Sequence, residues 1–149
     1  MIDNEMTLKI KAISQNEVFA RSTVAAFCLP LSPSLAEIND VKTAVSEAVT
    51  NAVVHAYSKG DVGEIEISAS LIQDRIHISI KDNGVGIENL DKAREPFFTT
   101  KPDDERSGMG FTVMETFMDS VEVISSVNNG TEVRMVKRIG IPAVREVNA

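Results

Sequence analysis

Features that would place this chain in several familiar protein classes are absent from its sequence. Its one cysteine, Cys28, cannot form an internal disulfide and is expected to be a small core residue. No apolar run approaches the ~20 residues of a membrane-spanning helix, and no signal-peptide pattern opens the chain. The net charge of -7 argues against a nucleic-acid-binding surface. We therefore expect a cytoplasmic protein that binds neither membrane nor nucleic acid directly.

Common nucleotide-binding and catalytic motifs are also missing. No Gly-x-x-x-x-Gly-Lys-Ser/Thr occurs, which excludes a P-loop, and the strand, third glycine and distal acid of a dinucleotide fingerprint are absent. The sequence has no metal-binding cluster of His and Cys and no recognisable Ser-His-Asp set. A nucleotide site, if present, must use another arrangement.

The most informative stretch that the chain does contain is Asp82–Gly86, with the sequence Asp-Asn-Gly-Val-Gly. It follows a segment in which Ile76, Ile78 and Ile80 alternate with polar residues, and this parity places Asp82 on the apolar side of a strand. Burying an unpaired carboxylate costs on the order of several kcal/mol, so Asp82 needs partners. The glycines let the backbone pass close to a ligand. The stretch predicts a pocket in which Asp82 accepts a hydrogen bond from a base's amino group.

Asn83-Gly84 is also the strongest short signal for a β-hairpin turn, and on this stretch alone the two interpretations are equally supported. The residues that follow decide between them, because no β-rich run comes after Gly86 to pair with the strand. The pocket is therefore favoured over the turn.

A long amphipathic helix is predicted to open at Ser32–Glu37, which contains a Ser-x-x-Glu capping box, and to run to about Ala56. Within it Glu47, Asn51 and His55 recur at intervals of four residues and therefore stack along one face. The carboxylate and carboxamide of Glu47 and Asn51 are suited to orient a hydroxyl or a hydrated Mg²⁺ ion. For His55 a structural hydrogen bond is the favoured explanation.

The start of the chain predicts a strand followed by a helix. Residues 6–12 alternate between apolar and polar, and Ser14–Glu17 resembles a second capping box for a helix that ends near Leu29. Arg21 lies off the predicted core stripe and is available to a partner, although most single surface arginines are only solvated. That stripe consists of Val18, Phe19, Ser22, Ala25, Ala26 and Leu29.

From Ile87 to Ser107 the sequence loses its period and predicts a long loop of the kind that often forms a lid. Its hydroxyls, Lys101 and Arg106 suit polyphosphate oxygens, while its run of acids favours a solvated loop as the alternative. The turn Ser107–Gly110 then leads into an apolar helical run. Such a turn presents backbone amides and the positive end of the helix dipole to an anion.

The order of elements is strand, helix, helix, two strands, lid, helix, two strands. The last hairpin is expected to turn at Asn128–Gly130, with Thr131 opening its final strand. This order predicts an α+β two-layer sandwich in which helices cover one face of a mixed, largely antiparallel sheet. We expect one domain over residues 1–149, with a loosely attached tail at 140–149.

Three motifs resemble the boxes of a known superfamily. Glu47–Ala52, Asp82–Gly86 and Arg106–Phe111 are similar, in this order, to the N, G1 and G2 boxes of the ATP-binding superfamily that includes gyrase, histidine kinases and MutL. Chain length, the Thr99–Pro102 segment and similarity over residues 3–139 narrow the resemblance to the bacterial anti-sigma factor serine kinases. The sporulation branch is the nearest and the general stress branch the alternative. The resemblance implies a Bergerat ATP-binding fold and a homodimer.

The same resemblance implies roles for individual residues. Asp82 is expected to bind the adenine amino group with help from Thr131. Asn51 is expected to ligate Mg²⁺, and Glu47 to act as general base on a serine hydroxyl. Arg21 matches a position of partner contact. The residues expected to shape the adenine pocket or to meet the phosphates are Gly84, Gly86, Thr99, Lys101, Arg106, Gly108, Met109 and Gly110.

The implied activity has two parts. Members of this family hold a sigma factor away from RNA polymerase and, with ATP and Mg²⁺, phosphorylate a serine of an anti-anti-sigma protein. Two other classes stay open: a binding module whose nucleotide only sets its conformation, and an ATP hydrolase or histidine kinase catalytic domain. A histidine kinase would have to be a fragment, since the chain has no room for a separate phosphoacceptor helix pair.

Overall fold

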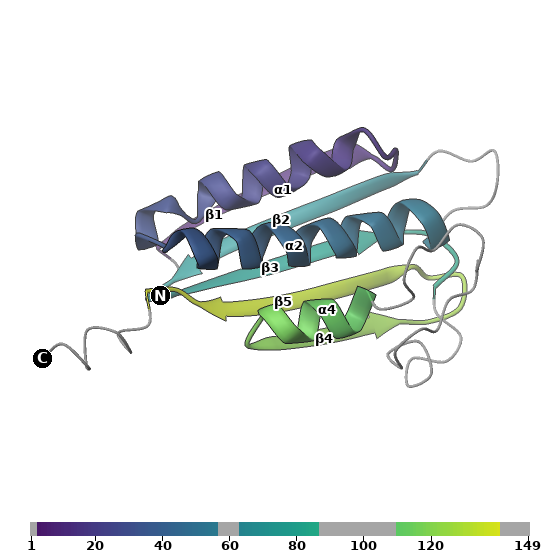
Figure 1. Ribbon diagram of the computed structural model, residues 1–149. Helices are drawn as coiled ribbons and strands as arrows, with labels where there is room; N and C mark the ends of the chain where they lie inside the picture. The colour runs from purple at the N-terminus through teal and green to yellow at the C-terminus, as the bar shows by residue number, and fades with distance from the viewer. Residues whose placement is uncertain (1–2, 57–62, 87–109, 141–149) are drawn as a thin grey trace, which may run out of the picture.

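An antiparallel sheet with helices on one face forms the part of the protein that the computed structural model describes, residues 3–56, 63–86 and 110–140 (Figure 1). The sheet has five strands in the order β1-β2-β3-β5-β4. Its elements are β1 (Asn4–Lys11), α1 (Asn16–Phe27), η1 (Leu29–Leu31), α2 (Leu35–Asn51), η2 (Ala52–Ala56), β2 (Glu64–Ile72), β3 (Arg75–Asp82), α4 (Gly110–Phe117), β4 (Ser120–Ser125) and β5 (Thr131–Arg138).

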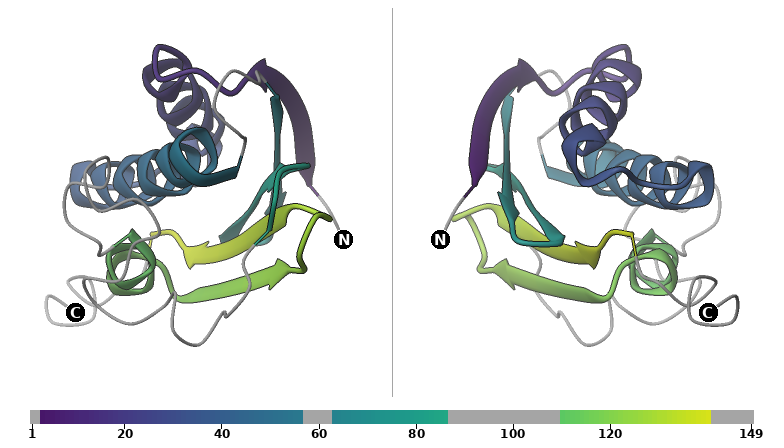
Figure 2. Two further views of the ribbon diagram at one scale, coloured as in Figure 1. Left: turned by 90° about the vertical axis from the view of Figure 1, so that its right-hand side faces the viewer. Right: turned by 90° about the vertical axis from the view of Figure 1, so that its left-hand side faces the viewer.

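The helices α1, α2 and α4 lie on one side of the sheet and leave its other face uncovered by any described element (Figure 2). This arrangement confirms the predicted α+β two-layer sandwich, and every strand pair is antiparallel. No helix in the described ranges is long and apolar enough to cross a membrane.

The core follows from the alternation of apolar and polar residues along the strands. Because partners across an antiparallel pair point to the same face, the register sets side chains in rows across the sheet. One such row on the helix-covered face is apolar throughout and consists of Leu8, Ile67, Ile80, Val133 and Val123. These rows pack against the buried side of α2 and make one continuous core.

The long second helix begins where the sequence predicts. Ser34 is its N-cap: the Glu37 amide donates to Ser34 Oγ at 3.1 Å, and the Ser34 amide donates to Glu37 Oε1 at 2.8 Å. The helix continues to Asn51 and then widens into the π-turn η2, which ends at Ala56. Single π-turns within helices are frequent at functional sites. This one places the end of α2 against the loop that follows β3.

Of the core stripe predicted for the first helix, only Ala25 is buried, and the rest of that prediction is wrong. Val18 and Phe19 are 52% and 53% exposed, and Leu29, just beyond the helix, is 55% exposed. The face that packs on α2 is instead Ala20, Val24, Ala25 and Cys28. The helix has small or apolar residues on two faces, and the smaller set is buried because it lets α1 approach α2 closely. Cys28 is buried as expected, and burial raises the pKa of its thiol to about 11.

The capping box expected at the start of α1 does not form. Gln15 is the N-cap and no side chain caps the helix, while Ser14 Oγ donates to the Gln15 side chain at 3.5 Å. The Glu17 carboxylate instead accepts from Arg21 and from the hydroxyl of Ser46 on α2. Because Glu17 bonds to Ser46 of α2, it does not accept from the backbone amides at the start of α1 as a cap would.

Candidate functional site

At one end of the sandwich the inner face of the sheet changes from apolar to polar. Asp82, Thr131 and Ser125 form a row across β3, β5 and β4, directly beyond the apolar row that contains Ile80 and Val133. The ends of α2 and β3 and the start of α4 lie at this same end, on the right in Figure 1. Asn51, Asp82 and Gly110, one from each of the three predicted motifs, therefore stand at the ends of elements that meet this end of the sandwich.

Asp82 is the acidic centre of this row, and it is only 6% exposed. Its Oδ1 accepts from the amides of Gly84 at 2.9 Å and Thr131 at 3.3 Å. Burial raises the pKa of the carboxyl, and these two amides oppose the rise. Within the described part of the chain, Oδ2 has no hydrogen-bond partner. The prediction that Asp82 points inward is confirmed, and Oδ2 is an acceptor suited to a ligand's amino group.

The loop after Asp82 is held from both sides by backbone. The Val85 amide donates to Ala56 O at 2.6 Å, and the Asn128 amide donates to Val85 O at 2.7 Å. The loop is therefore clamped between η2 and the β4–β5 turn. This clamp fixes the position of Asp82 without any ligand.

The two glycines of this loop are explained by that clamp. A Cβ at Gly84 would lie 1.9 Å from Ala56 O, and one at Gly86 would lie 2.0 Å from Ser126 O. Gly86 also has φ +78, a region that side chains disfavour. The sequence suggested that the glycines make room for a ligand, but the close contacts seen are with protein backbone. Their part in shaping an adenine pocket stays a prediction.

Asn51 lies where α2 meets the start of α4. A Cβ on Gly110 would be 2.8 Å from Asn51 Nδ2 and 3.2 Å from Oδ1, so a side chain at this position would require the Asn51 carboxamide to move. Glu47, one turn earlier, and Asn51 are both partly exposed, as a pocket wall requires. Mg²⁺ takes oxygen ligands, keeps several waters and needs only one or two protein ligands beside substrate phosphates. Asn51 Oδ1 can supply one such oxygen, while the adjacent N-terminus of α4 suits the phosphates and not the cation.

Other predicted positions fall outside this cluster or outside the described residues. Arg21 lies on α1, where its guanidinium donates to Glu17 at 2.8 and 3.0 Å. Its availability to a partner is therefore limited by an ion pair within the helix.

The predicted phosphate contacts that lie outside the described residues are Thr99, Lys101, Arg106, Gly108 and Met109. Of the tail, Gly140 donates its amide to Glu37 at 2.9 Å.

Ser125 is a polar member of the row that sequence reasoning missed. A signal was available, since Val121, Val123 and Ser125 alternate in phase and place Ser125 on the inner face of β4. Val127 lies in the turn beyond this strand and is exposed.

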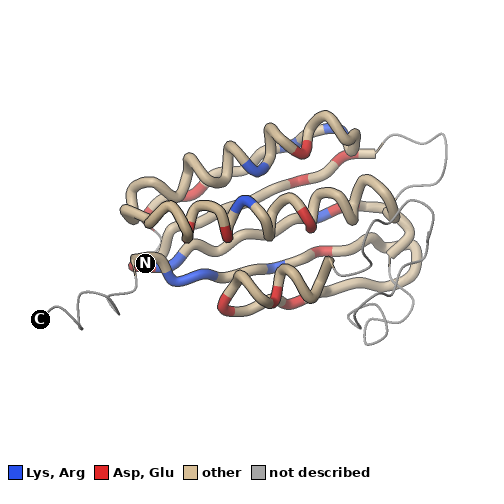
Figure 3. Tube along the Cα trace, viewed as in Figure 1, with Lys and Arg blue, Asp and Glu red and all other residues tan. Residues whose placement is uncertain are grey.

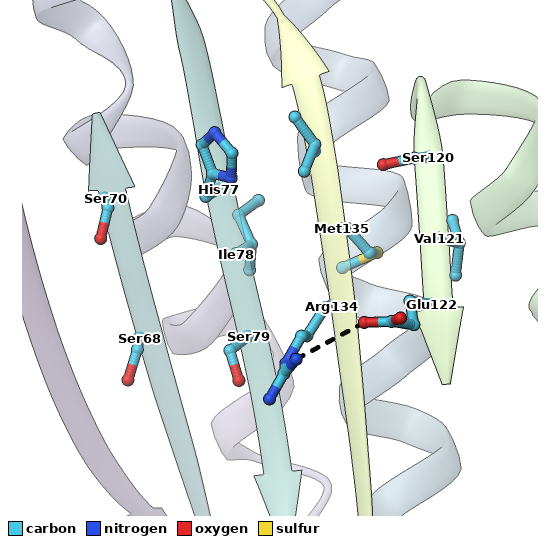
Figure 4. A pocket seen from close by; sticks show the side chains of 11 residues that line it. Ser68, Ser70, His77, Ile78, Ser79, Ser120, Val121, Glu122, Arg134 and Met135 are labelled. Carbon is cyan, nitrogen blue, oxygen red and sulfur yellow. Dashed lines mark hydrogen bonds and ion pairs between the residues drawn. The ribbon is translucent and has the colours of Figure 1, made fainter. Parts of the chain in front are cut away.

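A groove on the opposite face of the sheet does not compete with this site. Ser68, Ser70, His77 and Ser79 line it together with Arg134 (Figure 4). Its charged lining residues pair with each other, since Arg134 lies 3.5 Å from Glu122, and Arg134 also donates to Glu132 at 3.0 Å. No set of three or more His, Cys, Asp or Glu that could hold a metal occurs in the ranges described.

Comparisons with known proteins show the family to which the chain is similar. Residues 14–137 match the histidine kinase-like ATPase domain. The chain is 55% identical over 138 residues to an anti-sigma F factor of Clostridium perfringens, covering 93% of this chain and 99% of that one. It is 54% identical over 136 residues to the anti-sigma F factor of Anoxybacillus flavithermus, covering 91% and 93%.

A solved structure of similar fold supports the architecture alone. The RsbU and RsbW domains of a Mycobacterium tuberculosis protein superpose with a TM-score of 0.65 at 17% identity, covering 91% of this chain and 32% of that one. The family match and the relatives cover the segments that carry Asn51, Asp82 and Thr131. The chain therefore belongs to the histidine kinase-like ATPase domain family and, within it, to the anti-sigma F factors.

Proposed function

We propose that this chain is an anti-sigma factor and protein serine kinase that sequesters a sporulation sigma factor of the sigma F type. With Mg-ATP it phosphorylates a serine of its anti-anti-sigma antagonist. The observation that carries the proposal is the buried Asp82, whose Oδ2 is unpaired among the described residues, at the same end of the sandwich as Asn51 and the start of α4. The identity to anti-sigma F factors over nearly the whole chain supports the choice of partners.

The residues divide the chemistry among them. Asp82 and Thr131 would hold the base, Asn51 would ligate Mg²⁺, and the backbone amides at the start of α4 would hold the phosphates. When bound, Mg-ATP supplies the phosphoryl group and neutralises the charge that develops on its oxygens. Glu47 takes the proton of the incoming serine hydroxyl. Phosphoryl transfer depends mainly on positioning and electrostatics, and a general base adds about 10²- to 10⁴-fold.

The exposed face of α1 supports a protein partner at Arg21. Val18 and Phe19 leave a large apolar surface in water next to this arginine, and solvent-exposed apolar side chains that gather on one face mark interaction sites. Arg21 and the hydroxyl of Ser46 share Glu17 as acceptor. We infer that, when a partner docks on this face, an acidic side chain of the partner replaces Glu17 as the acceptor for Arg21.

The proposed homodimer is supported by the charge pattern on the uncovered face of the sheet. The whole chain is acidic, but charged residues of both signs lie along its strands (Figure 3), and several of them pair with each other on the outer face. Lys9 pairs with Glu66 at 4.0 Å, and Arg134 pairs with Glu132 and Glu122. Two copies can bring such balanced faces together without the repulsion that two acidic surfaces would meet. Light scattering of the purified chain measures the mass directly.

A phosphotransfer assay tests the proposed activity. Labelled ATP is incubated with the chain and an anti-anti-sigma protein, and the product is treated with acid and with base. We expect a base-labile, acid-stable phosphoserine, and we expect Glu47→Gln to lower the rate about 10²- to 10⁴-fold. Glu5→Gln, at the exposed start of β1, is the matched control and is expected to leave the rate unchanged.

Two outcomes contradict the proposal. Acid-labile phosphate would count against serine and favour a histidine kinase. If the Glu47→Gln variant transfers phosphate at the normal rate, the general base is misassigned. Retained sigma factor binding by this variant, with transfer lost, separates the kinase from the binding function.

A further inference from the structure

The hydroxyl of Thr131 is held in a fixed orientation by Ser125. The two residues are direct partners across β4 and β5, and Thr131 is the direct partner of Asp82 across β5 and β3. Directly opposed side chains have Cβ atoms about 4.5–5.5 Å apart on the same face of a sheet. Ser125, Thr131 and Asp82 therefore form a continuous polar row that leads from the edge strand to the base-binding acid.

The hydrogens in this row can be assigned from their partners. Ser125 Oγ donates to the carbonyl of Gly130 at 2.9 Å, and a hydroxyl has only one hydrogen to donate. With that hydrogen directed to Gly130, we assign Ser125 as the acceptor and Thr131 as the donor in their 2.8 Å contact. Thr131 Oγ1 is left with lone pairs only. On its other side lies the Asp82 carboxylate, also an acceptor.

We propose that Ser125 is a positioning residue for base selection. It accepts the hydrogen bond that the Thr131 hydroxyl donates, so that Thr131 can act only as an acceptor beside Asp82. Two adjacent acceptors suit the exocyclic amino group of a 6-aminopurine nucleotide, either directly or through a water. A carbonyl at the same place, as in a 6-oxopurine, would meet acceptors on both sides. This inference rests on the proposed ATP site and adds how that site rejects guanine and hypoxanthine.

Without Ser125 the Thr131 hydroxyl can rotate and donate. It can then bind a 6-oxo group through a bridging water, and part of the discrimination is lost. The turn that carries Gly130 keeps its backbone contact with β3 in either case, since a Cβ on Gly130 would lie 2.1 Å from Asp82 O. The change is therefore confined to the direction of one hydroxyl.

The test is calorimetric binding of ATP and ITP, which differ at the purine 6-position. We expect Ser125→Ala to reduce the ratio of ATP to ITP affinity by about three- to tenfold, the value of one neutral hydrogen bond. Ser125→Thr keeps a hydroxyl on a strand residue and is expected to retain the ratio. Ser79→Ala, on the outer face, removes a bonded hydroxyl elsewhere and serves as the control.

The outcomes distinguish this inference from the proposed function. An unchanged ATP to ITP ratio in Ser125→Ala, or an equal loss for both nucleotides, would overturn the inference while the ATP site stands. If the unmodified chain binds neither nucleotide, both the proposed function and this inference are contradicted. A reduced ratio in Ser125→Ala that Ser125→Thr restores supports the positioning role.

Discussion

Two charged side chains are buried among the described residues, and they lie at opposite ends of the helix-covered face of the sheet. Lys137 is 9% exposed and Asp82 is 6% exposed. The Lys137 ammonium donates to Phe117 O at 2.8 Å and pairs with Asp40 at 3.4 Å. Among the described residues the donors to Asp82 are two backbone amides, both of which donate to Oδ1. The Lys137 ammonium is thus satisfied by the protein, whereas the Asp82 carboxylate keeps Oδ2 as an acceptor for a ligand.

The comparison separates a structural charge from a functional one. A buried charge with a charged partner and a carbonyl acceptor ties elements together, in this case β5, α2 and the end of α4. A buried carboxylate whose pKa is raised by desolvation reduces stability, and a fold retains it for function. Mutations at the two ends should therefore have opposite effects on stability and binding.

The largest effect is expected from Asp82→Asn. It removes the charge that accepts from the base, and a hydrogen bond to a charged group contributes about 1.5–3 kcal/mol, or roughly ten- to a hundredfold in ATP affinity. Stability should be unchanged or higher, because a desolvated carboxylate is replaced by a neutral group. Calorimetry and thermal denaturation measure the two quantities. Full ATP affinity in this variant would show that Asp82 is not the base acceptor.

The converse change is Lys137→Met, which keeps the apolar stem and removes the ammonium. We expect a loss of about 1–3 kcal/mol in the free energy of unfolding, since Phe117 O and Asp40 lose their partner. Asp40 retains some exposure to water, which limits the loss. ATP affinity should not change. Urea denaturation measures the stability, and a concurrent loss of nucleotide binding would remove the distinction between the two ends.

The smallest effect is a pH dependence carried by Asp82. Because its folded pKa is raised, the stability it contributes is present at acid pH and is lost as pH rises through that pKa. Nucleotide binding has the opposite sign, since it needs the ionised acceptor and weakens as pH falls through the same pKa. Both dependences should disappear in Asp82→Asn. Identical pH profiles for this variant and the unmodified chain would contradict the assignment.

Much of the site was predictable because it depends on local periodicity. The alternation before Asp82 fixed its inward direction, and the spacing of Glu47 and Asn51 placed them on one face of a capped helix. Contacts between distant segments were not predictable. Nothing local indicates that Gly84 meets Ala56 O, or that Ser46 draws Glu17 away from a capping role.

By itself the sequence determined the order of strands and helices, the phase of the strands and the identity of the three motifs, since these follow from residue spacing and short-range sterics. The tertiary structure decided which face of α1 is buried. Both faces carry apolar residues, and only close packing against α2 selects Ala20 and Val24 over Val18 and Phe19. It also decided that Thr131 and Ser125 join Asp82 in one row, because strand register is a property of the sheet and not of any one strand.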